Sequence, residues 1–401
     1  MGDQPFKNAY WIWDDGDPKP VNGYRVFRKA FTLDKVLNLT PLYISAQSQY
    51  VLTIDDEYHG SGPAPSAPRH VAYDEYNIRL EPGEHIIEVV VHCLGIGTFS
   101  RIDSPGGLIL QLGDIVTDDS WLVANKSPWL ESGRFSKYLG FYEVQDSKLP
   151  THLLTVGLID PKEWHTAKMV SNADAQTYGV LEPRGTALAQ NENLCAGILV
   201  AYGNCSSEPI GNIASRLQNE PLRPMTTGKV SIDEISIMVA PDDNDIWLLF
   251  DFSYEVSGQL KFQIMSHYED SDAVIDIGYS EIFDPTVSAS GLIHGGEGFA
   301  YHYADQVKLG GGVYDYHGFH SHAFRYVRIA LRNLKKPLTI SWFGVNETTY
   351  PVQWRGSFTC SDARLDKIWE IGRRTLNLCM ADTFMDCPMR ERAQYIGDTR
   401  V

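Results

Sequence analysis

For its first 352 residues the sequence consists of short runs of β-branched and aromatic residues separated by turn-forming residues, and no long segment has helical periodicity. Typical runs are YRVFRKAFTL, which begins at Tyr24, and AVIDIGYSEIF, which begins at Ala273. A Pro82-Gly83 turn leads into the β-branched run from Ile86 to Val91. Strands at this spacing, with turn signals between them, are typical of antiparallel sandwiches and jelly rolls. The sequence therefore predicts a mainly β fold.

The hydrophobic period changes at about residue 353. In TCSDARLDKIWEIGRRTLNLCM, hydrophobic residues recur at the spacing of an amphipathic helix: Leu365, Ile368, Trp369, Leu376 and Met380. We expect a helix over about 362–380 with Thr359 or Ser361 as its N-cap. Pro388 cannot continue a helix without losing a backbone hydrogen bond, so residues 386–389 are expected to form a loop.

A chain of 401 residues is long enough for two or three domains. The changes of pattern predict an N-terminal β-sandwich over 1–180, a second β-sandwich over 181–352, and the start of a helical domain over 353–401.

Charge and composition bear on partners and location. The formal net charge of −17 disfavours binding to nucleic acid or to an anionic membrane face. No signal peptide and no run of eighteen apolar residues is visible, so the expected location is cytoplasmic. The six cysteines are scattered without a C-x-x-C motif, which favours reduced structural thiols: Cys93, Cys195, Cys205, Cys360, Cys379 and Cys387. No cofactor is expected. A homo-oligomer is left open.

The densest charge chemistry lies at the C-terminal end, in DCPMRERAQYIGD. Asp386, Arg390 and Glu391 fall within six residues, and Asp398 follows seven residues later. Cleavage of a glycosidic bond needs one carboxylic acid to protonate the leaving oxygen and a second carboxylate opposite it. Further carboxylates and an arginine are suited to sugar hydroxyls, because each makes two directed hydrogen bonds. The structural alternative is a solvated, salt-bridged helix start.

This motif resembles the signature of the α-L-rhamnosidases of glycoside hydrolase family 78. IWLLFDFSYEVSGQLKFQI, IGYSEIF and HGFHSHAFRYVRI resemble the β domain that precedes the catalytic domain of that family. SWLVANKSPW, GFYEV and EWHTAKMV resemble its N-terminal, galactose-binding-like sandwich. The resemblance implies that a catalytic (α/α)6 barrel begins at about residue 353 and acts on a rhamnose-containing glycoside or oligosaccharide.

Carried over residue by residue, the resemblance implies that Glu391 is the general acid of an inverting hydrolysis. Asp386, Arg390 and Asp398 would hold the rhamnose ring, and Tyr395 would offer an aromatic face. The chain departs from the family pattern twice, with Met389 where Gln is common and with Gln394-Tyr395 where Gly-Trp is common. Both departures bear on which sugar is preferred.

The length of the helical region leads to a further expectation. Twelve helices with their loops need roughly 190 residues, whereas 353–401 supplies 49. We expect the catalytic base to be absent and the 401-residue chain to be inactive alone. The alternatives are a non-catalytic carbohydrate-binding or scaffolding protein and an exo-acting hydrolase for another sugar.

Three other features of the sequence are candidate sites. His320 and His322 would point the same way on a strand, but no ligand motif accompanies them, so we expect sheet-surface or interface histidines and no metal. VKLGGGVYDY lacks the Lys-Ser/Thr ending of a phosphate loop. The tryptophans of the YWIW stretch at Tyr10–Trp13, with Trp121 and Trp129, are suited either to stacking on sugars or to a core.

Overall fold

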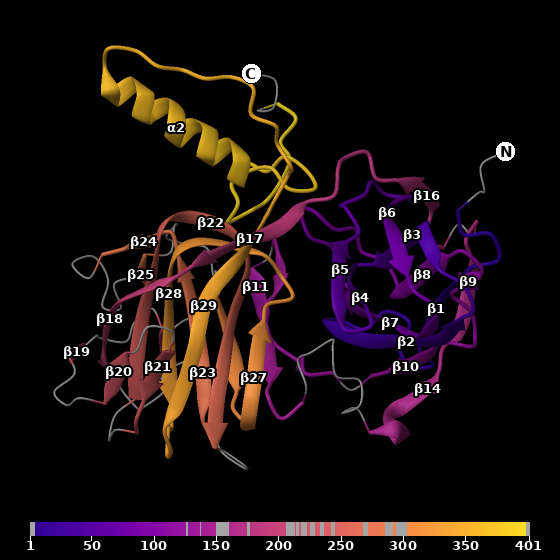
Figure 1. Cartoon of the computed structure of the whole chain (residues 1–401), viewed down its shortest axis with the longest axis horizontal. Helices are drawn as coiled ribbons and strands as arrows, with labels where there is room; N and C mark the ends of the chain where they lie inside the picture. The colour runs from indigo at the N-terminus through magenta and orange to yellow at the C-terminus, as the bar shows by residue number, and fades with distance from the viewer. Residues whose placement is uncertain are drawn as a thin grey trace. The chain divides into compact units, whose positions relative to one another are not determined.

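The computed structural model (Figure 1) describes residues 5–125, 127–136, 138–149, 160–174, 177–205, 213, 216–217, 223–224, 229–232, 236–241, 245–267, 272–284, 292–293 and 303–397. Most of them lie in strands, and the long helix of the described part, α2, lies near the C-terminus, so the predicted mainly β fold is confirmed. The chain forms two compact units, unit 1 (1–133 and 145–185) and unit 2 (134–144 and 186–401). The boundaries expected at 180/181 and 352/353 stay predictions.

Unit 1 contains two sheets in which neighbouring strands pair antiparallel, except that β16 pairs parallel with β6. The first sheet has the order β15 (Lys168–Asn172), β1 (Tyr10–Trp13), β8 (Gly107–Leu112), β3 (Leu37–Gln47), β6 (His70–Leu80), β16 (Val180–Pro183), with β9 (Ile115–Val116) beside β8. The second has the order β14 (Trp164–Thr166), β10 (Leu122–Ala124), β2 (Gly23–Leu33), β7 (Gly83–Cys93), β4 (Gln49–Ile54), β5 (Glu57–Gly62). A short 3-10 helix, η2 (Pro161–Glu163), precedes β14.

The core of unit 1 is built from alternate residues of both sheets. Ile87, Val89 and Val91 of β7 are buried with Leu108 and Leu110 of β8 in one cluster. This period of two places one face of each strand in the interior. The tryptophans singled out in the sequence are buried side chains, which favours the core reading over sugar stacking: Trp11, Trp13, Trp121 and Trp129.

Glu88, between the core residues Ile87 and Val89 of β7, is a buried carboxyl group. Its side chain is 3% exposed, and its Oε1 has no hydrogen-bond partner within the described part of the chain. Burial raises the pKa of Glu88 to about 8, although Arg28 opposes the shift. The folded protein therefore holds a proton on Glu88 at a pH where the unfolded chain has released it.

A raised carboxyl pKa gives stability that is complete below the unfolded value, 4.5, and is lost as pH rises towards 8. From pH 5 to 7.5 this group alone lowers the free energy of unfolding by roughly 3 kcal/mol. Glu88→Gln is expected to remove that loss, whereas Glu84→Gln, at an exposed position of the same strand, keeps it. Urea unfolding at both pH values measures the difference, and equal pH slopes in wild type and Glu88→Gln contradict the prediction.

Unit 2 is built on one large antiparallel sheet. Its main order is β13 (Val144–Asp146), β26 (Ala304–Lys308), β23 (Val274–Ser280), β28 (His322–Arg332), β22 (Asp245–His267), β29 (Leu338–Thr349), β21 (Ser236–Val239), β20 (Val230–Ile232). Four strands join it from the side: β17 (Gln190–Ala196) on β29, β18 (Ile198–Cys205) on β22, β19 (Arg223–Pro224) on β18, and β27 (Gly311–His317) on β22. Two small pairs complete the unit: β11 (Arg134–Ser136) with β12 (Gly140–Phe141), and β24 (Ile282–Phe283) with β25 (Leu292–Ile293).

The 23-residue strand β22 connects the two halves of this sheet (Figure 1). Its first half pairs with β18 and β28, and its second half pairs with β27 and β29. The register against β28 breaks between Asp251 and Val256. Just beyond the break, a Cβ at Gly258 would lie 1.8 Å from the carbonyl oxygen of Asn346, so only glycine fits there. The halves enclose a core of aromatic and aliphatic side chains that includes Phe250 and Phe262.

Helix α2 (Ala363–Leu378) confirms the predicted helix, but the predicted N-cap, Thr359 or Ser361, is wrong. Asp362 caps it, because its carboxylate accepts a hydrogen bond from the backbone N–H of Arg364. Within unit 2, Arg374 donates to the Glu347 carboxylate and, at 2.7 Å, to the carbonyl oxygen of Glu255. Four apolar side chains of the helix are about half exposed: Leu365, Ile368, Ile371 and Leu376.

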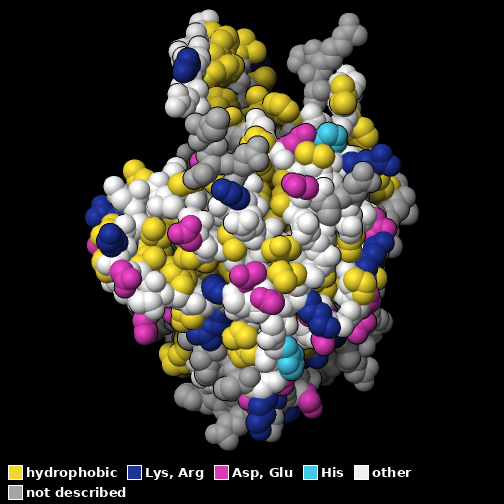
Figure 2. All heavy atoms as spheres, turned by 90° about the vertical axis from the view of Figure 1, so that its right-hand side faces the viewer, with side chains coloured by type: hydrophobic (Ala, Val, Ile, Leu, Met, Phe, Trp, Pro, Cys, Tyr) yellow, Lys and Arg dark blue, Asp and Glu magenta, His cyan; other side chains and the backbone are white. Residues whose placement is uncertain are grey.

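The surface and the helix bear on the partners expected from the sequence. On the face in Figure 2, acidic and basic side chains are interspersed and no large patch of one sign appears. Among the described residues, no helix has the length and apolar character needed to cross a membrane. The absence of nucleic-acid and membrane partners stays a prediction.

Candidate active site

The motif that the sequence singled out follows α2 as an irregular segment over 379–397, so the expected loop at 386–389 is confirmed. Two hydrogen bonds between Asp386 and Ala393 close the loop. The backbone N–H of Asp386 donates to the carbonyl oxygen of Ala393, and the N–H of Ala393 donates to Oδ1 of Asp386, both at 2.9 Å. Asp386 thus shapes the loop with one carboxylate oxygen while its side chain stays exposed.

Arg392 and Met389 attach the loop to unit 2. Arg392 donates to the carbonyl oxygen of Pro388 at 2.7 Å and to that of Ser321 at 2.6 Å. Burial lowers the pKa of Arg392 to about 10, which still leaves it charged at neutral pH. Met389 is buried in a cluster with Tyr303 and Phe135. The residue that departs from the family pattern is therefore part of the packing that fixes the loop.

Glu391 lies between these anchors and is half-buried. The hydroxyl of Tyr395 donates a hydrogen bond to Oε2 of Glu391. That bond, with the charges of Glu391 and Asp386 nearby, raises the pKa of Tyr395 to about 12. Three predicted site residues are therefore brought together: Asp386, Glu391 and Tyr395. A carboxyl group held in this way is able to donate a proton to a bound oxygen when it is protonated.

The other two predicted site residues are Arg390 and Asp398. Arg390 is exposed, next to the buried Met389. Asp398 lies outside the described residues.

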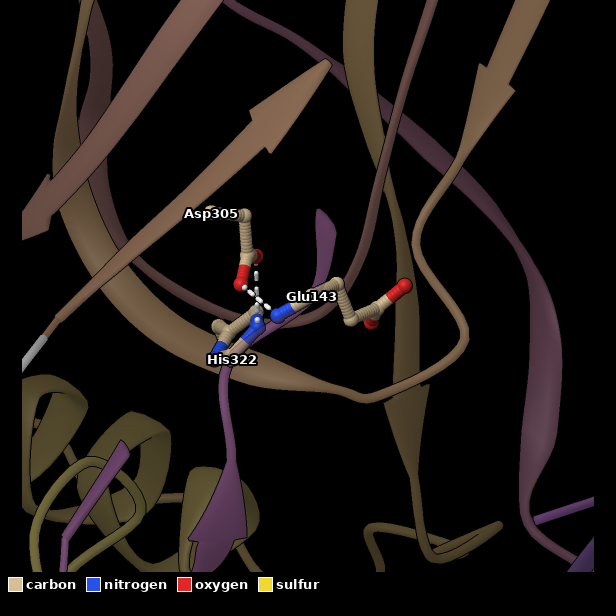
Figure 3. Close-up of side chains that lie close together, drawn as sticks. All are labelled: Glu143, Asp305 and His322. Atoms are coloured by element: carbon tan, nitrogen blue, oxygen red, sulfur yellow. Dashed lines mark hydrogen bonds and ion pairs between the residues drawn. The ribbon is translucent and has the colours of Figure 1, made fainter. Parts of the chain in front are cut away.

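Glu143, Asp305 and His322 form a buried cluster that the sequence did not reveal (Figure 3). Asp305 accepts hydrogen bonds from the backbone N–H of Glu143 at 2.7 Å and from the Tyr279 hydroxyl at 2.8 Å. Nε2 of His322 lies 3.1 Å from its Oδ2. His322 is 5% exposed, so the expectation of a sheet-surface histidine is wrong for this residue.

The Glu143 carboxylate is turned away from Asp305 (Figure 3) and accepts backbone N–H groups instead. Phe319 donates to Oε2 at 3.0 Å and His320 donates to Oε1 at 2.8 Å. Burial and the charge of Asp305 raise the pKa of Glu143. Although burial opposes it, His322 and the hydrogen bonds hold the pKa of Asp305 below its ordinary value.

One ligand atom of each of the three residues lies within 4.8 Å of the others, which is the spacing of a metal site. The four carboxylate oxygens of Glu143 and Asp305, however, already accept hydrogen bonds from groups of the protein. A cation would have to replace those donors. The donor set fits a buried structural hydrogen-bond network better than a metal centre.

A cavity of about 500 Å³ lies between α2 and the sheet of unit 2. Glu255, Glu281, Arg374 and Pro388 are among its lining residues, but Glu391 is not. Burial and the neighbouring Glu281 raise the pKa of Glu255 to about 8. The cavity borders the motif loop at Pro388 without containing the predicted acid.

Comparison with known proteins agrees with the resemblance drawn from the sequence. Residues 353–401 match the family described as the bacterial alpha-L-rhamnosidase 6 hairpin glycosidase domain. A search of curated protein sequences finds no match.

Several solved structures share the fold of nearly the whole chain. A family 78 rhamnosidase of Bacillus sp. GL1 is 20% identical with a TM-score of 0.78, over 99% of this chain and 61% of that one. The α-L-rhamnosidase of Dictyoglumus thermophilum is 18% identical with a TM-score of 0.63, over 98% and 41%. That of Aspergillus terreus is 19% identical with a TM-score of 0.61, over 97% and 42%. The chain thus spans about two fifths to three fifths of the structures whose fold it shares.

Proposed function

We propose that this chain is part of a glycoside hydrolase of the α-L-rhamnosidase type. The observation that carries the proposal is the match of residues 353–401 to the rhamnosidase six-hairpin domain, in the segment where Glu391 is held by Tyr395. The substrate is a glycoside or oligosaccharide that ends in an α-L-rhamnosyl residue.

In the proposed reaction Glu391 is the general acid. Its proton passes to the glycosidic oxygen as the bond to the anomeric carbon breaks, and a water molecule attacks that carbon from the opposite face. Asp386, Arg390 and Asp398 bind sugar hydroxyls, and Tyr395 covers a face of the ring while it orients Glu391. A second carboxylate, about 6.5–9.5 Å from the acid in inverting enzymes, activates the water.

We assign that base to a part of the six-hairpin domain other than residues 353–401. The described part of that region contains one helix, α2, followed by the motif loop. We therefore expect the purified 401-residue chain to release no nitrophenol from p-nitrophenyl α-L-rhamnopyranoside. Measurable turnover that survives repurification would contradict this assignment.

The function itself is tested on the product of the complete reading frame that encodes these residues. A panel of p-nitrophenyl glycosides should show turnover of the α-L-rhamnoside, and proton NMR should show β-L-rhamnose as the first product. Activity confined to another sugar overturns the substrate assignment. First release of α-L-rhamnose overturns the inverting mechanism.

A cytoplasmic location and a homo-oligomeric state stay proposals. Cell fractionation and light scattering are the corresponding measurements.

A further inference from the structure

Residues 134–144, here called the arm, are far from the motif loop in the sequence but pack within unit 2. Strands β11 and β12 of the arm pair with each other. Between them, the hydroxyl oxygen of Ser136 accepts the backbone N–H groups of Tyr138 and Leu139, both at 3.1 Å. The position of Tyr138 is therefore set by the backbone of a short hairpin.

The buried cluster of Figure 3 fixes the C-terminal end of the arm. Glu143 donates its backbone N–H to Asp305 and accepts the N–H groups of Phe319 and His320 with its carboxylate. The same bend, residues 318–321, presents the carbonyl oxygen of Ser321 to Arg392 of the motif loop. One bend thus holds both the arm and the loop that carries Glu391.

The arm also packs directly on that loop. Phe135 shares a buried cluster with Met389, and Tyr138, Leu139 and Tyr142 pack against this cluster. Tyr138 is half-buried and lies close enough to Tyr395 to contribute to the raised pKa of that phenol. Tyr395 in turn contacts Glu391.

We propose that Tyr138 is a sugar-binding residue of the Glu391 site. The arm supplies it, and the β11–β12 hairpin and the hydrogen bonds of Glu143 position it. The inference rests on the proposed function. A 6-deoxyhexose such as rhamnose has a methyl group and ring C–H groups that pack on an aromatic face, whereas its hydroxyls need charged or amide partners. Tyr138 of the arm packs against the cluster that contains Met389, and Tyr395 contacts Glu391, so two aromatic side chains border the motif loop.

The test uses the product of the complete reading frame labelled with fluorotyrosine and titrated with L-rhamnose, L-fucose and D-mannose. The fluorine resonances of Tyr138 and Tyr395, assigned with the variants Tyr138→Phe and Tyr395→Phe, should shift together with L-rhamnose and give one Kd. Tyr138→Ala should weaken that Kd by about 2- to 12-fold, and Tyr138→Phe should keep it near wild type. Tyr202→Ala, at a 40% exposed position of β18, is the control and should change nothing.

The outcomes separate the two proposals. A shift of Tyr395 alone, with an unchanged Kd in Tyr138→Ala, overturns the role of Tyr138 and leaves the rhamnosidase function standing. Shifts of both with a sugar other than rhamnose support Tyr138 and overturn the substrate. If no sugar shifts either resonance, both proposals fail.

Discussion

Replacing Glu391 by Gln is expected to lower kcat for hydrolysis of an unactivated α-L-rhamnoside by about 10²- to 10⁴-fold in the product of the complete reading frame. The amide of Gln fills the same space and still accepts the hydrogen bond from Tyr395, but it has no acidic proton to give to the leaving oxygen. KM should change little, because the substitution removes an interaction made in the transition state.

The leaving group provides the sharper comparison. A 2,4-dinitrophenyl rhamnoside leaves as a stable anion and needs little protonation, so its loss in Glu391→Gln should be much smaller than that of a p-methoxyphenyl rhamnoside. Glu370→Gln, in an exposed pair with Lys367 on α2, is the matched control and should retain wild-type rates. An equal loss with both leaving groups would assign Glu391 to sugar binding or to folding.

Replacing Asp276 by Asn is expected to lower the free energy of unfolding of unit 2 by about 3–5 kcal/mol. Asp276 is 0% exposed on the central strand β23. Its carboxylate accepts hydrogen bonds from Arg216, from Arg332 at 3.0 Å and from Gln306 at 2.8 Å. Removal of the negative charge leaves two arginines in the interior, and Asp245, 3.3 Å from Arg332, remains beside one of them.

The control lies on the same sheet. Asp251 also pairs with an arginine, Arg325, at 2.9 Å, but the two side chains are 20% and 39% exposed. A solvated pair is worth about 0–1 kcal/mol, so Asp251→Asn should have a small effect. Guanidinium unfolding of both variants at pH 7 measures the difference. Similar losses in the two variants would show that burial does not set the strength of these pairs.

Much of the fold was predictable because the hydrophobic period of each segment is a local property. The β-branched run of β7 and the 3.6-residue period of α2 are visible in the sequence. The N-cap was missed because Thr359, Ser361 and Asp362 are all good caps. Only the backbone conformation at Asp362 selected it.

The candidate site was predictable where its residues are neighbours in sequence. Asp386, Glu391 and Tyr395 lie within ten residues, and Pro388 required a loop. The prediction of a sheet-surface histidine was wrong for His322. Its burial depends on Asp305 and Glu143, which approach it only through strand pairing and through the arm.

The sequence by itself determined the type of each element and the segment that carries the predicted acid, since both follow from residues a few positions apart. The tertiary structure alone decided which residues surround that acid. Glu143 meets Phe319 across 176 residues, and Tyr138 approaches Tyr395 from still farther along the chain. Such contacts depend on how a whole sheet closes, and no local pattern of hydrophobic residues encodes that closure.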